Sequence, residues 1–388
     1  SRQPPEKTVP EPFKNLFNTN VISDMARHLR RASTEVRAPA FDEKGFRRRA
    51  GRDLEALELK ERSGQIEEAL TEFLPDDFSV AAEVLREAIR DHGHGSTEAG
   101  AAAPEGLSGL ALMPVADYVA RHGLEHFDLA LALLKDLTKR SSSEFAIRPF
   151  LAAEQERTLA VLEEWAGDAN HHVRRLVSEG TRPRLPWGKR LSAFVEDPSP
   201  VLPLLEALKD DPSEYVRRSV ANNLNDIAKD HPDLVVETAG RWLEGASEER
   251  RRLVRHACRT LVKQGHPGAL EFLGYGPPRI SLGALTVLTP VVRLGEALSF
   301  EVSFRSDSDS EQSLMVDYVI HHRKAKGTTS PKVFKWKILT LGAGKEHRAV
   351  RRHPIKRITT RTYYPGVHFV ELQVNGRAMG RDSFEVEV

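Results

Sequence analysis

Hydrophobic residues in the first two thirds of the chain recur with the period of an α-helix. Residues 12 to about 275 show this spacing almost throughout. Residues 48–74 carry one apolar stripe with charges opposite, made of Leu54, Leu57, Gln65, Ile66, Leu70 and Leu74. Further short helices are predicted over residues 127–140, 156–168, 199–211, 233–245 and 251–264, with proline, glycine or Asp-Pro breaks between them. Residues 91–110 are small, polar and rich in glycine, and predict a mobile connection.

The helical part also contains an internal repeat. "EYVRRSVANNLNDIAKDHP" from Glu214 and "ERRRLVRHACRTLVKQGHP" from Glu249 align without gaps at a period of 35 residues. Another Val-Arg-Arg begins at Val173, 43 residues before that at Val216. Such periods are typical of stacked helix pairs, so we expect a curved solenoid with a concave inner surface. Ser-Glu stands just ahead of Arg-Pro at Ser143 and again at Ser178, and we expect both pairs at equivalent places in their repeats.

After residue 276 the hydrophobic pattern changes to short runs with period two. These are "LSFEVSF", "LMVDYVIHH", "KVFKWKIL", "HFVELQVNG" and "DSFEVEV". Strands separated by Gly, Ser and Asp turns predict a β-sandwich of roughly 110 residues, immunoglobulin-like in size. The segment has no cysteine, so it lacks the disulfide of antibody domains. We therefore expect two domains, 1–276 and 277–388.

Composition is that of a soluble globular protein. Of 388 residues, 40% are hydrophobic and 29% charged, and no apolar run approaches the roughly 20 residues of a membrane-spanning helix. Cys258 is the only cysteine, which excludes an intramolecular disulfide and cysteine-based metal clusters. With no secretory signal evident, we expect a cytoplasmic, bacterial protein.

Charge is distributed unevenly, although the net charge is only +1. Residues 277–388 hold 18 Lys and Arg against 11 Asp and Glu. Within residues 321–361, 13 basic residues face a single acid, Glu346. This imbalance favours contact with phosphates or another polyanion. A solvated strand face is the alternative.

The sequence lacks the usual motifs of metal binding, nucleotide hydrolysis and serine hydrolysis. His171-His172 and His321-His322 are adjacent pairs, whose side chains point in different directions on a helix, and no Glu-x-x-His or Cys-x-x-Cys accompanies them. "GLSGLA" lacks the Gly-Lys-Ser/Thr of a phosphate loop, and no Gly-x-Ser-x-Gly is present. We expect neither a metal nor a cofactor.

Arginines and lysines recur at or near the same turn of successive repeats. They are Arg174, Arg175, Arg182, Arg184, Lys189, Arg190, Arg217, Arg218 and Arg250 to Arg252. Stacked repeats would join them into a strip that could follow a phosphodiester backbone. Alternatively, they line a solvated helix face or pair with acids of the next repeat. The residues alone leave both possibilities open.

Several long motifs resemble one family. "EPFKNLF" at Glu11, "LEALELKERS", "SSSEFAIRPFL", "HHVRRLVSEGTRPRLPW" and "VRRSVANNLNDIAKDHP" are similar to the AlkC branch of the HEAT-repeat alkylpurine DNA glycosylases, which are bacterial DNA alkylation repair proteins. The likeness covers essentially the whole chain, since this branch also ends in an immunoglobulin-like domain. Residues 92–106 look like a variable insertion. The implied fold class is an all-α HEAT-like repeat solenoid followed by a small all-β immunoglobulin-like sandwich.

The resemblance implies a DNA glycosylase that acts in base excision repair. Its substrates would be cationic 3-methyladenine and 3-methylcytosine in alkylated double-stranded DNA, cut by hydrolysis of the N-glycosidic bond. Such a base leaves as a neutral molecule without a general acid, so a carboxylate need only stabilise the oxocarbenium-like sugar and position water. The family holds the lesion without rotating it into a deep pocket, unlike most glycosylases. We expect the chain to act as a monomer.

The family pattern selects four catalytic candidates. Asp226 would stabilise charge and position water, while Glu144 and Glu179 would contact the lesion and sugar. Trp187 would add its indole face beside the sugar, worth about 0.5 to 2 kcal/mol. Each has a structural alternative: a helix cap for Glu144, an ion pair with Arg182 for Glu179, a brace for the Asn-rich turn at Asp226, and core packing for Trp187.

Two sets of basic residues are expected to hold the DNA. In the solenoid they are Arg148, Arg174, Arg175, Arg182, Arg184, Lys189, Arg190, Arg217 and Arg218. In the sandwich, which we expect to clamp the duplex, they are Arg323, Lys324, Lys326, Arg351 and Arg352. The rival interpretation is a non-enzymatic HEAT scaffold that binds nucleic acid or protein without using the three carboxylates. A carbohydrate-binding sandwich is less favoured, because Trp336 is the only tryptophan among the basic residues of 321–361.

Overall fold

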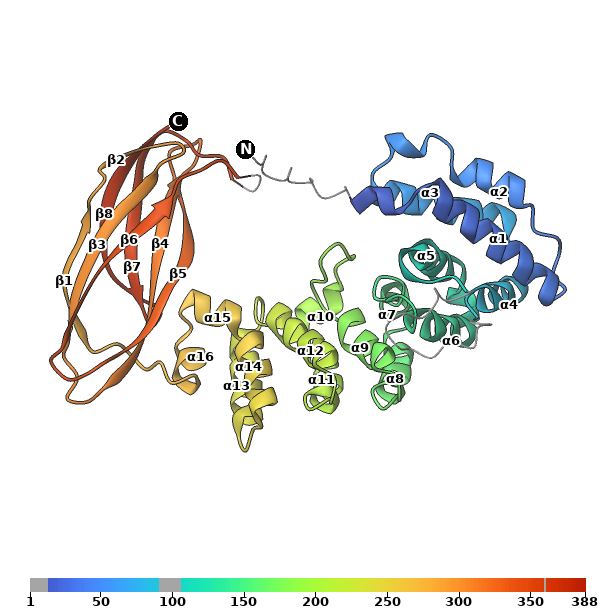
Figure 1. The fold of residues 1–388 in the computed structure, drawn as a ribbon. Coiled ribbons are helices and arrows are strands. Elements are labelled where there is room, and N and C mark those ends of the chain that lie inside the picture. Colours follow the sequence, from blue (N-terminus) through green and yellow to red (C-terminus); the bar gives the residue numbers. More distant parts are fainter. Residues whose placement is uncertain (1–12, 91–105, 359–360) are drawn as a thin grey trace, which may run out of the picture. The chain divides into compact units, whose positions relative to one another are not determined.

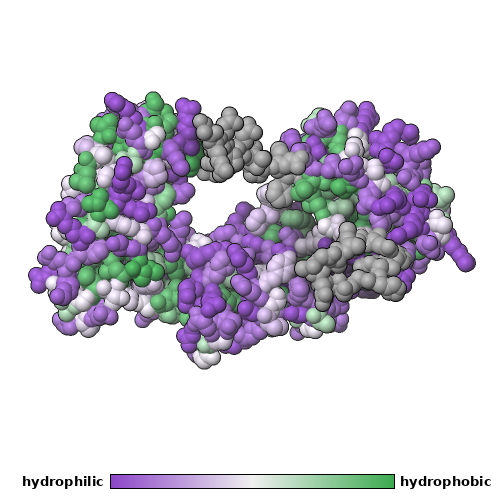
Figure 2. All heavy atoms as spheres, viewed as in Figure 1, coloured by the Kyte–Doolittle hydropathy of each residue, from purple (hydrophilic) through white to green (hydrophobic). Residues whose placement is uncertain are grey.

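The computed structural model of the chain describes residues 13–90, 106–358 and 361–388, and Figure 1 shows its helices and strands. The chain divides into two compact units, residues 1–230 and 231–388. Most of the predicted connection over 91–110 and nearly all of the 92–106 insertion lie outside the described residues. Among the described helices, none has the length and apolar character needed to cross a membrane. Hydrophilic residues make up most of the surface visible in Figure 2.

The first unit is helical throughout its described residues. Its α-helices are α1 (Thr19–Glu35), α2 (Glu43–Ala50), α3 (Leu59–Phe73), α4 (Phe78–Ala88), α5 (Leu112–His122), α6 (Phe127–Thr138), α7 (Arg148–Ala153), α8 (Gln155–Trp165), α9 (His171–Gly180), α10 (Ser192–Glu196), α11 (Leu202–Leu208) and α12 (Glu214–Ile227). Short 3-10 turns lie at Phe13–Leu16, Leu54–Ala56, Gly109–Ala111 and Leu124–His126.

The apolar stripe predicted over 48–74 is broken in the structure. Helix α2 ends at Ala50, and α3 begins only after Glu58, whose side chain and that of Glu61 form a capping box. Gln65, counted among the apolar positions, instead donates from Nε2 to the carbonyl oxygens of Ala50 and Arg52, at 2.8 Å each. The break is therefore held by polar contacts that hydropathy alone does not reveal.

The second unit begins with four helices and continues into strands. The helices are α13 (Pro232–Leu243), α14 (Glu248–Ala257), α15 (Arg259–Gln264) and α16 (Pro267–Phe272). The predicted helix over 251–264 is two helices, which meet at Cys258. Helix α12 starts at Glu214 and α14 at Glu248, at or next to the predicted repeat starts. The solenoid architecture and the boundary at residue 276 stay predictions, and α13 to α16 group with the strands rather than with the preceding helices.

In the described part of the second unit, eight strands form two sheets that share one core. The strands are β1 (Ile280–Val287), β2 (Val291–Arg293), β3 (Ala297–Ser306), β4 (Gln312–Arg323), β5 (Thr329–Leu341), β6 (Glu346–Pro354), β7 (Gly366–Val374) and β8 (Arg377–Glu387). One sheet has the order β1-β3-β6 and the other β2-β8-β7-β4-β5, and only the β2 and β8 pair is parallel. Phe300 of the first sheet packs with Tyr318 and Phe384 of the second. This arrangement is the expected β-sandwich.

Two glycines allow the helices to approach the sandwich closely. Gly265, which ends α15, and Gly376, in the β7–β8 turn, both have positive φ, at 77° and 75°. A Cβ on Gly265 would lie 2.6 Å from the Cα of Gly376, so neither position tolerates a side chain. Nearby, Asn375 donates from Nδ2 to the carbonyl oxygen of Gly276 at 2.7 Å. The α15–α16 segment is thus fixed against the sandwich.

Candidate active site

Helices α9 and α12 bring two of the predicted catalytic carboxylates together. Glu179 lies in the last turn of α9 and Asp226 in the last turn of α12. The fully buried Asn223 of α12 donates from Nδ2 to the carbonyl oxygen of Ser178 at 2.8 Å and to Oγ1 of Thr181 at 3.1 Å. These hydrogen bonds join the C-terminal ends of the two helices and so set the spacing of the acids.

Arg182 bridges the two carboxylates. Its Nη1 donates to Oε1 of Glu179 at 2.6 Å, and its Nε donates to Oδ2 of Asp226 at 2.8 Å. Only 7% of Arg182, 5% of Glu179 and 2% of Asp226 is exposed. Burial works against the charged guanidinium, but Glu179 and Asp226 outweigh it, and the net effect raises the pKa of Arg182. The suggested ion pair of Glu179 with Arg182 is present, and the predicted phosphate contact by Arg182 does not agree with its burial.

The remaining oxygen of each carboxylate also accepts a hydrogen bond. Ser219 donates from Oγ to Oε2 of Glu179 at 2.6 Å. Lys229 donates from Nζ to Oδ1 of Asp226 at 2.8 Å, and its side chain is 41% exposed. Each acid is therefore fixed in orientation, and Lys229 is the most accessible of their partners.

Glu144 connects to this pair through Arg175. Arg175 donates from Nη1 to Oε2 of Glu144 at 2.8 Å, and its Nη2 lies 3.6 Å from Oε1 of Glu179. The same guanidinium lies 4.7 Å from the ring centroid of Tyr215, which is 43% exposed. Glu144 stands in the turn before α7, whereas Glu179 is helical. The structure thus joins the three predicted acids, but the two Ser-Glu pairs do not occupy equivalent places.

Arg148 is buried and donates hydrogen bonds to the backbone at the end of α9 and in the loop that follows it. Its Nε donates to the carbonyl oxygen of Lys189 at 2.8 Å, and its Nη1 donates to those of Gly180 and Arg182 at 2.9 and 2.8 Å. The residue is only 2% exposed, and burial lowers the pKa of its guanidinium to about 10. The contact with DNA predicted for Arg148 does not agree with this burial, because its Nε and Nη1 are already bonded to backbone carbonyl oxygens.

Trp187 lies on the loop that Arg148 anchors. It is 69% exposed and has φ of 64°, a left-handed conformation that costs a bulky residue roughly 1 to 2 kcal/mol. Lys60 donates from Nζ to its carbonyl oxygen at 2.7 Å. The alternative of core packing is therefore wrong for Trp187. An exposed indole on a strained backbone is instead typical of a binding residue.

The other predicted cations of the first unit divide into paired and exposed ones. Arg174 forms two hydrogen bonds with Asp211, at 2.6 and 2.9 Å, and Arg184 two with Asp230, at 2.7 and 2.6 Å. For these two arginines the alternative of pairing with a later acid holds. Exposed side chains without an ion pair to any described residue remain at Lys189, Arg190 and Arg218.

The first arginine of each Val-Arg-Arg element has a common structural contact. Arg174 donates from Nη1 to the carbonyl oxygens of Asp168 and Ala169, five and six residues earlier. Arg217 makes the same two contacts, with Asp211 and Pro212. Both arginines thus hold the turn that precedes their own helix.

The predicted cations of the sandwich do not share one face. Arg323 ends β4, and Lys324 and Lys326 are exposed in the β4–β5 turn. Arg352 is exposed on β6 in the other sheet. Arg351 pairs with the core residue Phe300 in register, and its guanidinium lies 5.7 Å from the ring centroid of Tyr318. Arg351 therefore points inward, and its predicted phosphate contact does not fit.

The histidine pairs have partners other than a metal. His171 and His172 contact the ring of Tyr215 edge-on, with centroids 6.0 and 5.7 Å away. His321 lies 3.4 Å from Oε2 of Glu371. Within residues 13–90, 106–358 and 361–388, no three His, Cys, Asp or Glu side chains form a group that could hold a metal ion.

Sequence reasoning missed four contributors to the site. They are Tyr215, Ser219, Asn223 and Lys229. Ser219, Asn223 and Asp226 follow one another at helical spacing in a helix whose other buried positions, apart from Asn225, are apolar. A buried polar stripe of this kind was the available signal.

The comparisons agree with one another on the family. Residues 112–261 match the family described as "DNA alkylation repair enzyme", and residues 281–388 match "Uncharacterised protein YhaZ, C-terminal Ig-like domain". The Bacillus subtilis (strain 168) "Uncharacterized protein YhaZ" is 39% identical over 378 residues, which cover 97% of this chain and 99% of that protein. The structure of Pseudomonas fluorescens alkylpurine DNA glycosylase AlkC, bound to DNA containing an abasic site analog, is similar with a TM-score of 0.85 and 37% identity. That match covers 97% of this chain and 100% of the other.

Proposed function

The chain belongs to the AlkC-like family of DNA alkylation repair glycosylases, and from this membership we propose that it excises cationic N3-alkylated bases from double-stranded DNA. The proposed substrates are 3-methyladenine and 3-methylcytosine. The observation that carries the proposal is the buried pair Glu179 and Asp226, which Arg182 joins at 2.6 and 2.8 Å. Two fixed negative charges of this kind suit a reaction in which positive charge moves from a base to a sugar.

The reaction requires one bond to break and one to form. The C1′–N bond breaks and its electron pair stays with the base, which leaves as a neutral molecule. The sugar then carries positive charge until water adds at C1′ and loses a proton to a carboxylate or to solvent. Asp226 is the proposed stabiliser of that charge, because a carboxylate that is only 2% exposed acts through a medium of low dielectric constant.

Release of Lys229 from Asp226 is the proposed step that exposes this carboxylate to the substrate. It occupies Oδ1 at 2.8 Å, yet its side chain is 41% exposed, so a nearby phosphate can compete for its ammonium group. Release of Lys229 would leave Oδ1 open to the sugar or to water, while Arg182 continues to hold Oδ2. DNA binding would thereby strengthen the negative potential at Asp226 when the sugar becomes positively charged.

The surroundings support a lesion held without a deep pocket. Trp187 offers an exposed indole for the sugar, and the proposed backbone contacts are Lys189, Arg190 and Arg218, whose side chains are exposed. In the second unit, Arg323, Lys324, Lys326 and Arg352 are the proposed clamp residues. Each unit can contribute phosphate contacts by itself.

The decisive experiment is release of free bases from methylated duplex DNA, separated by chromatography. Wild-type chain should release 3-methyladenine and 3-methylcytosine, and Asp226→Asn should lower the rate by about a hundredfold or more while DNA affinity is kept. Asp230→Asn is the matched control, because Asp230 is also ion-paired but lies outside the cluster. Unchanged excision by Asp226→Asn would remove that residue's role. Binding without any base release by wild type would favour the scaffold instead.

A further inference from the structure

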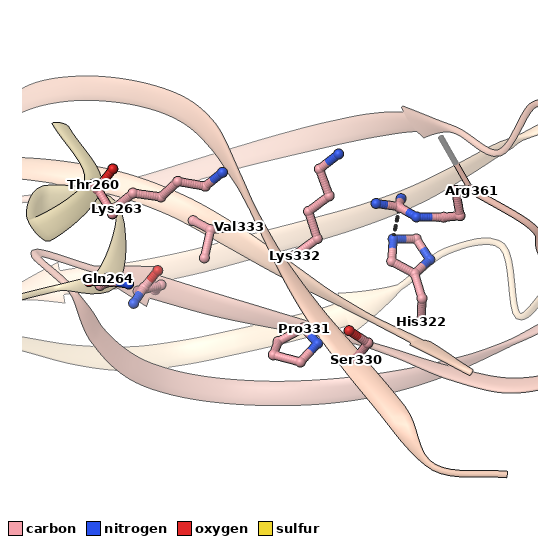
Figure 3. Close-up of a pocket in the computed structure, with 10 residues that line it drawn as sticks. Thr260, Lys263, Gln264, His322, Ser330, Pro331, Lys332, Val333 and Arg361 are labelled. Carbon is pink, nitrogen blue, oxygen red and sulfur yellow. Dashed lines mark hydrogen bonds between the residues drawn. The ribbon is translucent and has the colours of Figure 1, made fainter. Parts of the chain in front are cut away.

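A cavity of about 580 Å³ lies within the second unit, at the junction of α15 with the sandwich. Lys263 on α15, His322 on β4, Lys332 on β5 and Arg361 contribute to its walls. Figure 3 shows these side chains from separate segments around one space. The close fit of Gly265 against Gly376 fixes α15 relative to the strands, so the walls are held by packing.

Positive charge in this cavity has no partner of opposite sign. Lys263, Lys332 and Arg361 all line it, and none of its lining residues is acidic. None of the three cations forms an ion pair with a carboxylate in the described part of the chain. The buried Asp317 lies within electrostatic reach of Lys263, but it does not line the cavity. Three cations gathered around one space raise its potential and favour an anion there.

His322 orients the arginine of this cluster. Arg361 donates from Nη1 to Nε2 of His322 at 2.7 Å, which Figure 3 marks with a dashed line. Burial and then the charge of Arg361 lower the pKa of His322 to about 3, so the imidazole is neutral at physiological pH and its Nε2 accepts. The other N–H groups of the guanidinium remain for a ligand, and the hydroxyl of Ser330 stands on the adjoining wall.

We propose that this cavity binds a phosphate group. Phosphate carries up to two negative charges and several acceptor oxygens, which match one guanidinium, two ammonium groups and a hydroxyl. The inference goes beyond the proposed function, because no candidate catalytic or DNA-contacting residue lines the cavity. A phosphodiester of DNA and a free phosphate ester share this chemistry, and the experiment separates them.

The test is titration calorimetry of the full chain with inorganic phosphate, at constant ionic strength in chloride. Wild type should bind one phosphate per chain with a saturable signal. Lys332→Gln combined with Arg361→Gln should weaken binding by about tenfold or more, since each change removes charge-assisted hydrogen bonds. The matched control is Lys345→Gln with Arg377→Gln, which removes two exposed positive charges outside the cavity and should change affinity by less than about twofold.

Three results would overturn the proposal: no saturable binding by wild type, full affinity in the cavity variant, or an equal loss in the control. If the double variant unfolds early by circular dichroism, Lys263→Gln at the exposed end of α15 replaces it, with an expected loss of about threefold. Undamaged duplex DNA then identifies the source. Displacement of phosphate by duplex, with weaker duplex binding in the cavity variant, assigns a DNA phosphodiester, whereas phosphate binding that persists in saturating duplex assigns a free ester. Both support the cavity, and neither depends on base release.

Discussion

Replacing Arg182 with glutamine should destabilise the first unit strongly. Arg182 neutralises Glu179 and Asp226 together through hydrogen bonds of 2.6 and 2.8 Å, and all three residues are almost completely buried. Removing one partner of a buried ion pair costs about 3 to 5 kcal/mol, because the remaining charge is left in a poorly solvated site. Two carboxylates are left here, although Ser219 and Lys229 still donate to them, so we expect a loss of about 4 kcal/mol.

Arg184→Gln provides the matched control two residues along the chain. Arg184 also makes two hydrogen bonds with a carboxylate, that of Asp230, at 2.7 and 2.6 Å, but both side chains are 25% exposed. Water can replace the lost partner at this site, so we expect a much smaller loss than for Arg182→Gln. Arg182→Lys should fall between, near 2 kcal/mol, because an ammonium group keeps the charge without the fork that spans two acids.

Hydrogen exchange read by mass spectrometry across a urea series is the suitable assay. Because the chain has two compact units, a single unfolding curve would mix their transitions, whereas peptides from α9 and α12 report the first unit directly. A loss below about 1 kcal/mol for Arg182→Gln, or a loss equal to that of Arg184→Gln, would refute the account of a buried bridge.

Four further outcomes follow from changes at other sites. Trp187→Gly should leave urea stability unchanged or raise it by about 1 kcal/mol through relief of positive φ, yet slow base release; a stability loss would contradict the strain. Burial raises the pKa of Asp117 to about 6, so the folded chain binds more protons than the unfolded chain between about pH 4 and 6, and its contribution to stability falls as pH rises through that range. Asp117→Asn should therefore stabilise by about 1 to 3 kcal/mol at pH 8 and not at pH 4 in urea titrations. Burial raises the pKa of Cys258 to about 12, so a thiol reagent at pH 8 should label it only after unfolding. Lys189→Gln with Arg190→Gln should lower the slope of log affinity against log salt by about 0.9 per lost phosphate contact, and an unchanged slope would exclude both.

The succession of helices and then strands could be predicted, because the helical part and the strand part of the chain each keep one hydrophobic period. The alternation in "LSFEVSF" became β3, with every second residue buried. By contrast, β6 was not predicted as a strand, since "EHRAVRRHP" carries charge on both faces. Strand β4 was predicted from "LMVDYVIHH" as an alternating run, but it is buried on both faces over much of its length. The burial of these two strands could not be predicted, because it depends on which elements pack against each face. The hydropathy of the strand itself carries no information about those neighbours.

The three acids and the ion pair of Glu179 with Arg182 could be suggested from the sequence, but the partners of the other arginines could not. Glu144, Glu179 and Asp226 stand in long segments that resemble one family, and the structure joins them through Arg175 and Arg182. Whether an arginine faces solvent or an acid depends on how two helix ends meet. The distance between the ends of α9 and α12 is set by contacts such as that of Asn223 with Ser178, which lie 45 residues apart in the chain.

The repeat itself indicates which arginines remain for DNA. In both Val-Arg-Arg elements the first arginine, Arg174 or Arg217, donates to carbonyl oxygens five and six residues earlier. Because the first arginine makes the same structural contact in both elements, only the second arginine can take a different partner in each. Arg175 joins the carboxylate cluster, whereas Arg218 is exposed without an ion pair to any residue the structure describes. The basic strip expected from the sequence therefore overstates the number of arginines that are free to contact a phosphate, because the first arginine of each pair already binds the turn before its own helix.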